Sequence, residues 1–175
     1  MRQSLRPYQT ICALLLCLPL LAFTAQGQVP ASHATTFSGQ SIAFPEVLAG
    51  RPAILVVSFS RKGGEAARQW NERLSRDFGS NPAIAYYNLP MLADVPSLLR
   101  RMVTSAIKKS VPSRDHPHFA PLFDHAAEWK SAAGYATKDD AYVLLVSREG
   151  RIVWRAHGPC SDALLHELSA KLQQP

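Results

Sequence analysis

The sequence predicts a single α/β domain in which a central mixed β-sheet carries helices on both faces. Residues 53–59 (AILVVSF) are apolar and rich in β-branched side chains, as in a central strand buried on both faces. Residues 65–78 place an apolar residue at every fourth position, which predicts an amphipathic helix. Residues 142–147 and 151–156 have the pattern of two strands, and the Ser-Arg-Glu-Gly turn between them indicates a hairpin.

The other predicted elements, in chain order, are a short strand or hairpin at 37–44, a turn at 45–50, a strand at 83–88, a helix from Asp94 or Ser97 to Val111, a helix from Phe119 through Trp129 to about Gly134, and a last helix capped by Ser161. Periodicity places the apolar residues of the second helix inside, namely Leu98, Leu99, Met102, Val103, Ala106 and Ile107. The three tryptophans, Trp70, Trp129 and Trp154, are expected in the core.

A basic start followed by an apolar run predicts that residues 1–27 are a signal peptide. Arg2 and Arg6 precede residues 11–23 (ICALLLCLPLLAF), a run shorter than the about 20 apolar residues of a membrane span. The small residues of Ala-Gln-Gly predict cleavage after Gly27. We therefore expect an exported protein, periplasmic or secreted; an uncleaved segment would instead anchor it in the inner membrane.

Cleavage would leave 148 of the 175 residues, about the size of one domain. We expect a flexible leader at 28–36 and one domain at 37–175. Without Arg2 and Arg6, 17 basic residues oppose 13 acidic ones, a net charge of +4 spread along the chain. This distribution does not predict a nucleic-acid partner. Cys160 is the only cysteine outside the predicted signal, so no intramolecular disulfide can form and a packed core must stabilise the domain.

The order of the elements over residues 37–172 resembles the thioredoxin-like superfamily. The paired cysteines of its redox members lie where the first buried strand turns into a helix, because a helix N-terminus lowers the thiol pKa. Residues 60–67 (SRKGGEAA) occupy that turn and contain no thiol. The proline that enters the late hairpin of redox members is also absent, since Asp140 and Ala141 stand there. The resemblance therefore implies the fold without dithiol–disulfide exchange or a peroxidatic cysteine.

Within the superfamily the chain most resembles the mitochondrial ATPase-complex assembly factor ten family. Residues 142–158 (YVLLVSREGRIVWRAHG) match its late motif, in which an aromatic residue and an apolar run precede Gly-basic-Ile-x-Trp-x-x-x-Gly. The strand end at 57–60 and Trp70 are also similar. The resemblance implies a protein without dithiol chemistry that helps assemble the membrane sector of ATP synthase. Those proteins act on the side equivalent to the bacterial cytoplasm, whereas this chain begins with a predicted export signal.

Two functional hypotheses follow. The first is a non-catalytic binding or assembly protein for a protein client, such as a membrane complex, with no cofactor. The alternative is a thiol-dependent oxidoreductase acting through Cys160, which precedes the last helix, where the helix dipole would stabilise a thiolate. His157 is expected close to this thiol, although no second thiol is present. The oligomeric state stays open.

A loop rich in histidine offers a third hypothesis. His116, His118 and His125, with Asp115 and Asp124, form the densest set of potential zinc or copper ligands. Their spacing is not diagnostic, so a solvated polar loop is the alternative. The second helix also has a basic side, which would suit an anionic lipid surface or an acidic partner, or would simply face solvent. This side comprises Arg100, Arg101, Lys108, Lys109 and Arg114.

Overall fold

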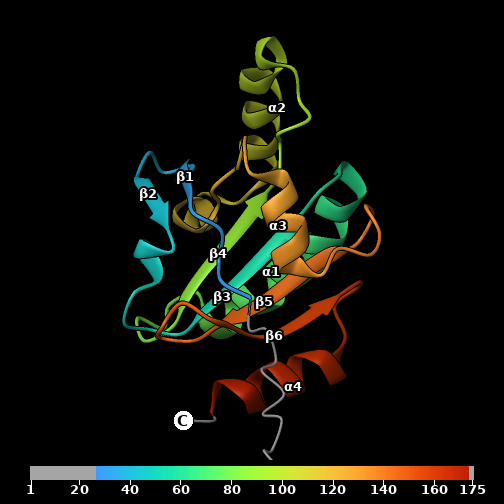
Figure 1. The fold of residues 1–175 in the computed structure, drawn as a ribbon. Coiled ribbons are helices and arrows are strands. Elements are labelled where there is room, and N and C mark those ends of the chain that lie inside the picture. Colours follow the sequence, from blue (N-terminus) through green and yellow to red (C-terminus); the bar gives the residue numbers. More distant parts are fainter. Residues whose placement is uncertain (1–26, 174–175) are drawn as a thin grey trace, which may run out of the picture.

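A computed structural model describes residues 27–173 of the protein (Figure 1). The predicted signal peptide lies outside the described residues, apart from Gly27. The elements, in chain order, are β1 (Ser32–Thr35), β2 (Ser41–Phe44), the short 3-10 helix η1 (Glu46–Leu48), β3 (Ala53–Ser58), α1 (Arg61–Phe78), β4 (Ala85–Pro90), α2 (Ser97–Ser110), the 3-10 helix η2 (Ser113–His118), α3 (Ala126–Ala133), β5 (Ala141–Val146), β6 (Ile152–His157) and α4 (Asp162–Leu172).

The main sheet has the strand order β4-β3-β5-β6. Strand β3 is parallel to β4 and antiparallel to β5, and β5 is antiparallel to β6. Helices α1 and α4 cover one face, while α3 and the β1–β2 hairpin cover the other. The predicted mixed sheet with helices on both faces is therefore confirmed.

Every residue of β3 and of β5 is buried. Because successive side chains of a strand point to opposite faces, these mostly apolar strands present an apolar surface on both faces of the sheet. A tryptophan anchors each layer. On one face the indole N–H of Trp70 donates to the carbonyl of Gly158 at 3.0 Å, and on the other Trp129 donates to Oγ of Ser32 at 2.9 Å. A buried indole donor needs such a partner, so these bonds fix distant segments to the core. Trp154 is buried as well, which confirms the expectation for all three tryptophans.

Three elements differ from their predicted extent. Helix α1 begins at Arg61 because Ser60 caps it, so Gly63 and Gly64 lie in its first turn and not in a preceding loop. Helix α3 begins only at Ala126, since residues 119–122 run extended beside β4, with bridges from Phe119 and Leu122. The predicted leader at 28–36 contains β1, which pairs with β2.

The expectation that the apolar residues of α2 face the core is wrong. None of its residues is buried, and the exposed fractions of Leu98, Met102 and Leu99 are 92%, 63% and 44%. Figure 1 shows α2 projecting away from the sheet. The helix is amphipathic as predicted, but no element within residues 27–173 buries its apolar side chains, of which Val103 and Ile107 are half-buried. Within residues 27–173, no helix combines the length and the hydrophobicity that a membrane span requires.

The contrast between α4 and α2 gives a first prediction. Leu168 in α4 is fully buried, so Leu168→Ala should lower the free energy of unfolding by about 2–5 kcal/mol through lost transfer energy and a cavity. Leu98→Ala in α2 should change it by less than about 0.5 kcal/mol. Urea unfolding followed by circular dichroism measures both. A loss at Leu98 as large as that at Leu168 would contradict the exposed position of α2.

Candidate functional site

The turn between β3 and α1 is held by Ser60. Its Oγ accepts a hydrogen bond from the backbone N–H of Gly63 at 2.9 Å and donates one to Oδ1 of Asp139 at 3.2 Å. Ser60 and Gly63 have the spacing of a C-x-x-C pair at a helix start, the place where the resemblance puts the dithiol of redox members. Here the first position is a capping hydroxyl, and the second is a glycine.

Gly63 is buried against the loop that enters β5. A Cβ atom on Gly63 would lie 2.7 Å from the carbonyl oxygen of Asp140 and 3.1 Å from that of Lys138. Both neighbours are backbone atoms, so a side chain at this position would force the loop to move. The turn therefore lacks a thiol and also lacks the space for a second one.

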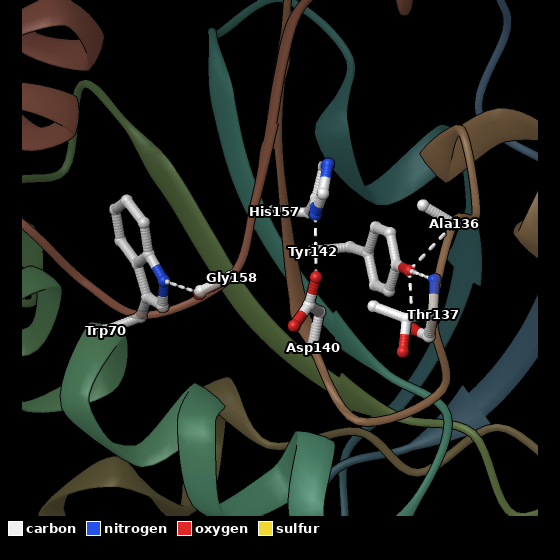
Figure 2. Close-up of polar contacts among 7 residues, drawn as sticks. All are labelled: Trp70, Ala136, Thr137, Asp140, Tyr142, His157 and Gly158. Carbon is white, nitrogen blue, oxygen red and sulfur yellow. Dashed lines mark hydrogen bonds and ion pairs between the residues drawn. The ribbon is translucent and has the colours of Figure 1, made fainter.

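Charged pairs join the same loop to its surroundings. Nζ of Lys62 lies 3.8 Å from Oδ2 of Asp139, and Nδ1 of His157 forms a hydrogen bond of 2.7 Å with Oδ2 of Asp140 (Figure 2). Lys62 and His157 are exposed, so each pair contributes at most about 1 kcal/mol. Their effect is to orient the loop beside the start of α1.

Tyr142 fixes the other end of this loop. Its hydroxyl accepts hydrogen bonds from the backbone N–H groups of Ala136 and Thr137, at 3.0 and 2.8 Å, and donates to the carbonyl of Thr137 at 2.6 Å (Figure 2). Its ring stacks on Tyr135 and His157. The loop is therefore tied to the sheet at one end and to α1 at the other. The sequence predicts no role for Asp139, and none for Tyr142 beyond its place in the late motif.

The structure does not bring Cys160 and His157 together. Cys160 is half-buried and packs against the core cluster beneath α1 and α4, whereas the His157 ring stacks on Tyr142, which belongs to the core of the opposite face. Ser161 caps α4 by accepting the N–H of Leu164 at 3.3 Å, so this N–H group is already paired within the protein. Burial raises the pKa of the Cys160 thiol above its usual value. Among the nearby charges Arg73 lowers this pKa, while Asp162 and Asp77 raise it.

The histidine loop does not converge on one point either. The ring of His116 contacts the carbonyls of Lys108 and Val111, and that of His118 contacts the carbonyl of Tyr86. His125 has a left-handed backbone conformation and pairs with Glu128 at 3.6 Å. Within residues 27–173, no group of three or more His, Cys, Asp or Glu side chains is arranged to hold a metal ion.

A large groove that the sequence does not predict lies between α1 and α2, with a volume of about 1360 Å³. We call it the α1–α2 groove. One wall is apolar and comes from α2, through Met102, Val103, Ala106 and Ile107. The opposite wall is charged and comes from α1, through Arg61, Glu65, Arg68, Glu72 and Arg76. The floor includes Asn88, Pro90, Met91 and Leu92 at the end of β4, and Ser58 to Arg61 close one end. In the sequence, the feature that sets α2 apart is its composition, with four basic and no acidic residues.

The fold and this turn define the class of protein: the chain has a thioredoxin-like fold without a dithiol at the start of α1. It is similar to a protein described as the thiol:disulfide interchange protein DsbE of Chlorobium tepidum, with a TM-score of 0.60 and 14% identity over 84% of this chain and 96% of that one. A protein described as a protein disulfide isomerase of Bacteroides thetaiotaomicron has a TM-score of 0.57 and 18% identity over 85% and 90%.

A third similar structure is BsSco, described as a member of the Sco family of cytochrome c oxidase assembly proteins. Its TM-score is 0.55, with 10% identity over 86% of this chain and 96% of that one. At these identities the likeness shows the fold and not the activity. No protein-family model and no curated protein matches the sequence.

The two glycines of α1 give a second prediction. Gly63→Ala should lower the free energy of unfolding by about 1–3 kcal/mol, because its Cβ overlaps the Asp140 carbonyl. Gly64→Ala is the matched control, since its Cβ would meet only Oγ of Ser58 at 3.9 Å, and it should stabilise by about 0.4–1 kcal/mol. Urea unfolding compares them. If both substitutions stabilised the protein equally, the 138–140 loop would have moved to accommodate the new Cβ atom, which would contradict the tight packing at Gly63.

The environment of Cys160 gives a third prediction. Its thiol should titrate above the about 8.5 of a free cysteine, because burial disfavours the thiolate. The pH dependence of its alkylation rate measures this pKa. His157→Ala should leave the midpoint unchanged, since His157 packs on the opposite face of the sheet. A midpoint below that of free cysteine would contradict the inert environment and support a reactive thiol.

Proposed function

We propose that this chain is an exported, non-catalytic protein of thioredoxin-like fold that binds a protein client and assists its assembly. The observation that carries the proposal is the turn at the start of α1, where Ser60 acts as a cap and Gly63 has no space for a side chain. Dithiol exchange needs two thiols at such a turn. Without these two thiols the fold still offers a surface to another protein, so binding is the function that we propose.

We propose a membrane complex such as ATP synthase as the client. The support is the late motif at 142–158 and its resemblance to the mitochondrial ATPase-complex assembly factor ten family. BsSco offers a parallel, because it has a similar fold and is described as belonging to a family of assembly proteins. This step is an analogy between proteins of one fold. Export is a further part of the proposal and rests on the composition of residues 1–27.

The competing hypothesis is an oxidoreductase that acts through Cys160. Such a thiol needs an activating base or charge, and burial raises the pKa of Cys160 instead. Cys160 is the only free cysteine among residues 27–173, so no resolving thiol is available within that part of the chain. We therefore retain this hypothesis only as an outcome of the test below.

The test is a crosslinking pull-down in cells, and it gives a fourth prediction. The tagged full-length protein and its Cys160→Ser variant are crosslinked in parallel, and the captured proteins are identified by mass spectrometry. We expect membrane subunits of ATP synthase, or of one other membrane complex, to be enriched equally with both. Partners captured by the parent protein and lost with Cys160→Ser would indicate mixed disulfides. Isolation of the protein without any enriched partner would overturn the binding proposal.

A further inference from the structure

Helix α2 presents an exposed side that is both apolar and basic. Each residue of this side lies three or four positions from another member of the set, which places them all on one side of the helix. We call this side the outer face of α2, and it comprises Leu98, Arg101, Met102, Ser105 and Lys109, all of them exposed. Leu98 and Met102 are the two most exposed large apolar side chains of the described residues, at 92% and 63%. Neighbouring apolar side chains that are this exposed mark a surface that another molecule covers.

The charge of α2 is positive and largely unpaired. Residues 97–110 contain four basic and no acidic side chains. The guanidinium of Arg100 is bound to two backbone carbonyls of the preceding loop, so it faces the domain. Arg101, Lys108 and Lys109 are exposed, and none of them forms an ion pair within residues 27–173. These three cations are complementary to an anionic partner.

The acidic residues nearest to α2 in the chain lie toward the groove. Asp94 and Asp115 both line the α1–α2 groove, whose described lining contains four acidic and four basic side chains. On the other side of α2, a shallower pocket faces the β1–β2 hairpin and is lined by Lys108 and His33, with no acidic residue among its described lining. The excess of positive charge therefore belongs to the exposed side of α2 and not to the groove.

The outer face offers no pocket to a partner within the described residues. Leu98, Arg101 and Lys109 line neither the groove nor the pocket beside the hairpin. Figure 1 shows that α2 projects away from the sheet. A tightly bound protein partner usually seats its anchoring side chains in pockets. A bilayer surface needs none, because its headgroups and acyl chains move apart around an inserted side chain.

We infer that the outer face of α2 binds the surface of a bilayer that contains anionic phospholipids. Leu98 and Met102 insert among the acyl chains just below the headgroups. Arg101 and Lys109 contact the lipid phosphates, while their apolar stems lie along the interface. Helix α2 has 14 residues, fewer than the about 20 of a membrane span, so it lies on the surface. The inference goes beyond the proposed function and does not depend on it, since lipid and not a client protein covers this face.

The fifth prediction places a reporter on the outer face. Leu98→Trp adds an exposed indole, whereas the three native tryptophans are buried. With vesicles of phosphatidylglycerol and phosphatidylcholine, the emission of this full-length variant should shift to shorter wavelength, and brominated acyl chains should quench it. Val153→Trp is the matched control, since Val153 is exposed but lies on β6, at the other edge of the sheet from β4, and it should show neither effect. Equal quenching of both reporters, or quenching of neither, would overturn the inference. The predicted signal peptide is present in both variants, so it does not account for a difference between them.

Charge substitutions test the selection of anionic lipid. Adding Arg101→Gln and Lys109→Gln to the Leu98→Trp variant should weaken its binding to the vesicles at least about tenfold, because each cation near an anionic surface contributes about fivefold. Arg148→Gln with Arg151→Gln is the control pair. It removes the same charge from the β5–β6 turn, at the opposite end of the sheet, and should leave binding unchanged. An equal loss with both pairs would reflect net charge alone and overturn the inference. Unchanged midpoints of urea unfolding would show that both variants are folded.

An acidic protein is the alternative partner of the outer face, and the pull-down distinguishes it from lipid. The Arg101→Gln/Lys109→Gln variant is crosslinked beside the parent protein. A client that this variant loses, while its vesicle binding stays unchanged, would assign the outer face to a protein and overturn the inference. A client captured equally by both, with vesicle binding lost in the variant, would support the inference and the proposed function. Quenching of the reporter without any captured client would refute the proposed function and support the inference.

Discussion

Burial of β3 and β5 on both faces is the constraint on which the rest of the structure depends. Each strand presents apolar side chains to two layers, so the chain must supply a cover for each face. Trp70 fills one layer and Trp129 the other, and each indole N–H binds an acceptor far away in the chain. The bond of Trp129 to Ser32 ties β1 to the core, and that of Trp70 to Gly158 ties down the corner between β6 and α4. Both layers are therefore fixed to the same sheet by bonds between residues that are far apart in the sequence.

The same constraint closes the turn at the start of α1. Because β3 and β5 are neighbours, the loop that enters β5 must pass the N-terminus of α1, and the Asp140 carbonyl comes to rest against Gly63. Tyr142, the second residue of β5, holds the preceding residues by three hydrogen bonds. The ion pairs of this region are largely exposed and contribute little. Packing and backbone hydrogen bonds, and not charge, therefore keep the turn closed.

Local patterns in the sequence predict the parts of this fold that depend on local physics. The buried strands, the helix cap at Ser161 and the end of α3 at Gly134 all follow from residue type and spacing. The extended run from Phe119 to Leu122 has the apolar spacing of a helix, and its pairing with β4 is non-local, so the sequence does not reveal it. The apolar face of α2 is assigned to the core because periodicity defines a face but does not show what covers it. The sequence does not predict the role of the 138–140 loop either, because that role depends on its contact with Gly63, which is distant in the sequence.

Helix α1 connects the closed turn with the open groove. Its inner side, through Ala67, Trp70 and Leu74, is packed in the core, so the helix is held in a fixed position. Its first turn is locked to the 138–140 loop, and its outer side forms the charged wall of the α1–α2 groove. The groove therefore has one rigid wall, while α2, which has no buried residue, forms the other. The apolar face of α2 therefore lies open beside a fixed wall, on the least constrained part of the fold.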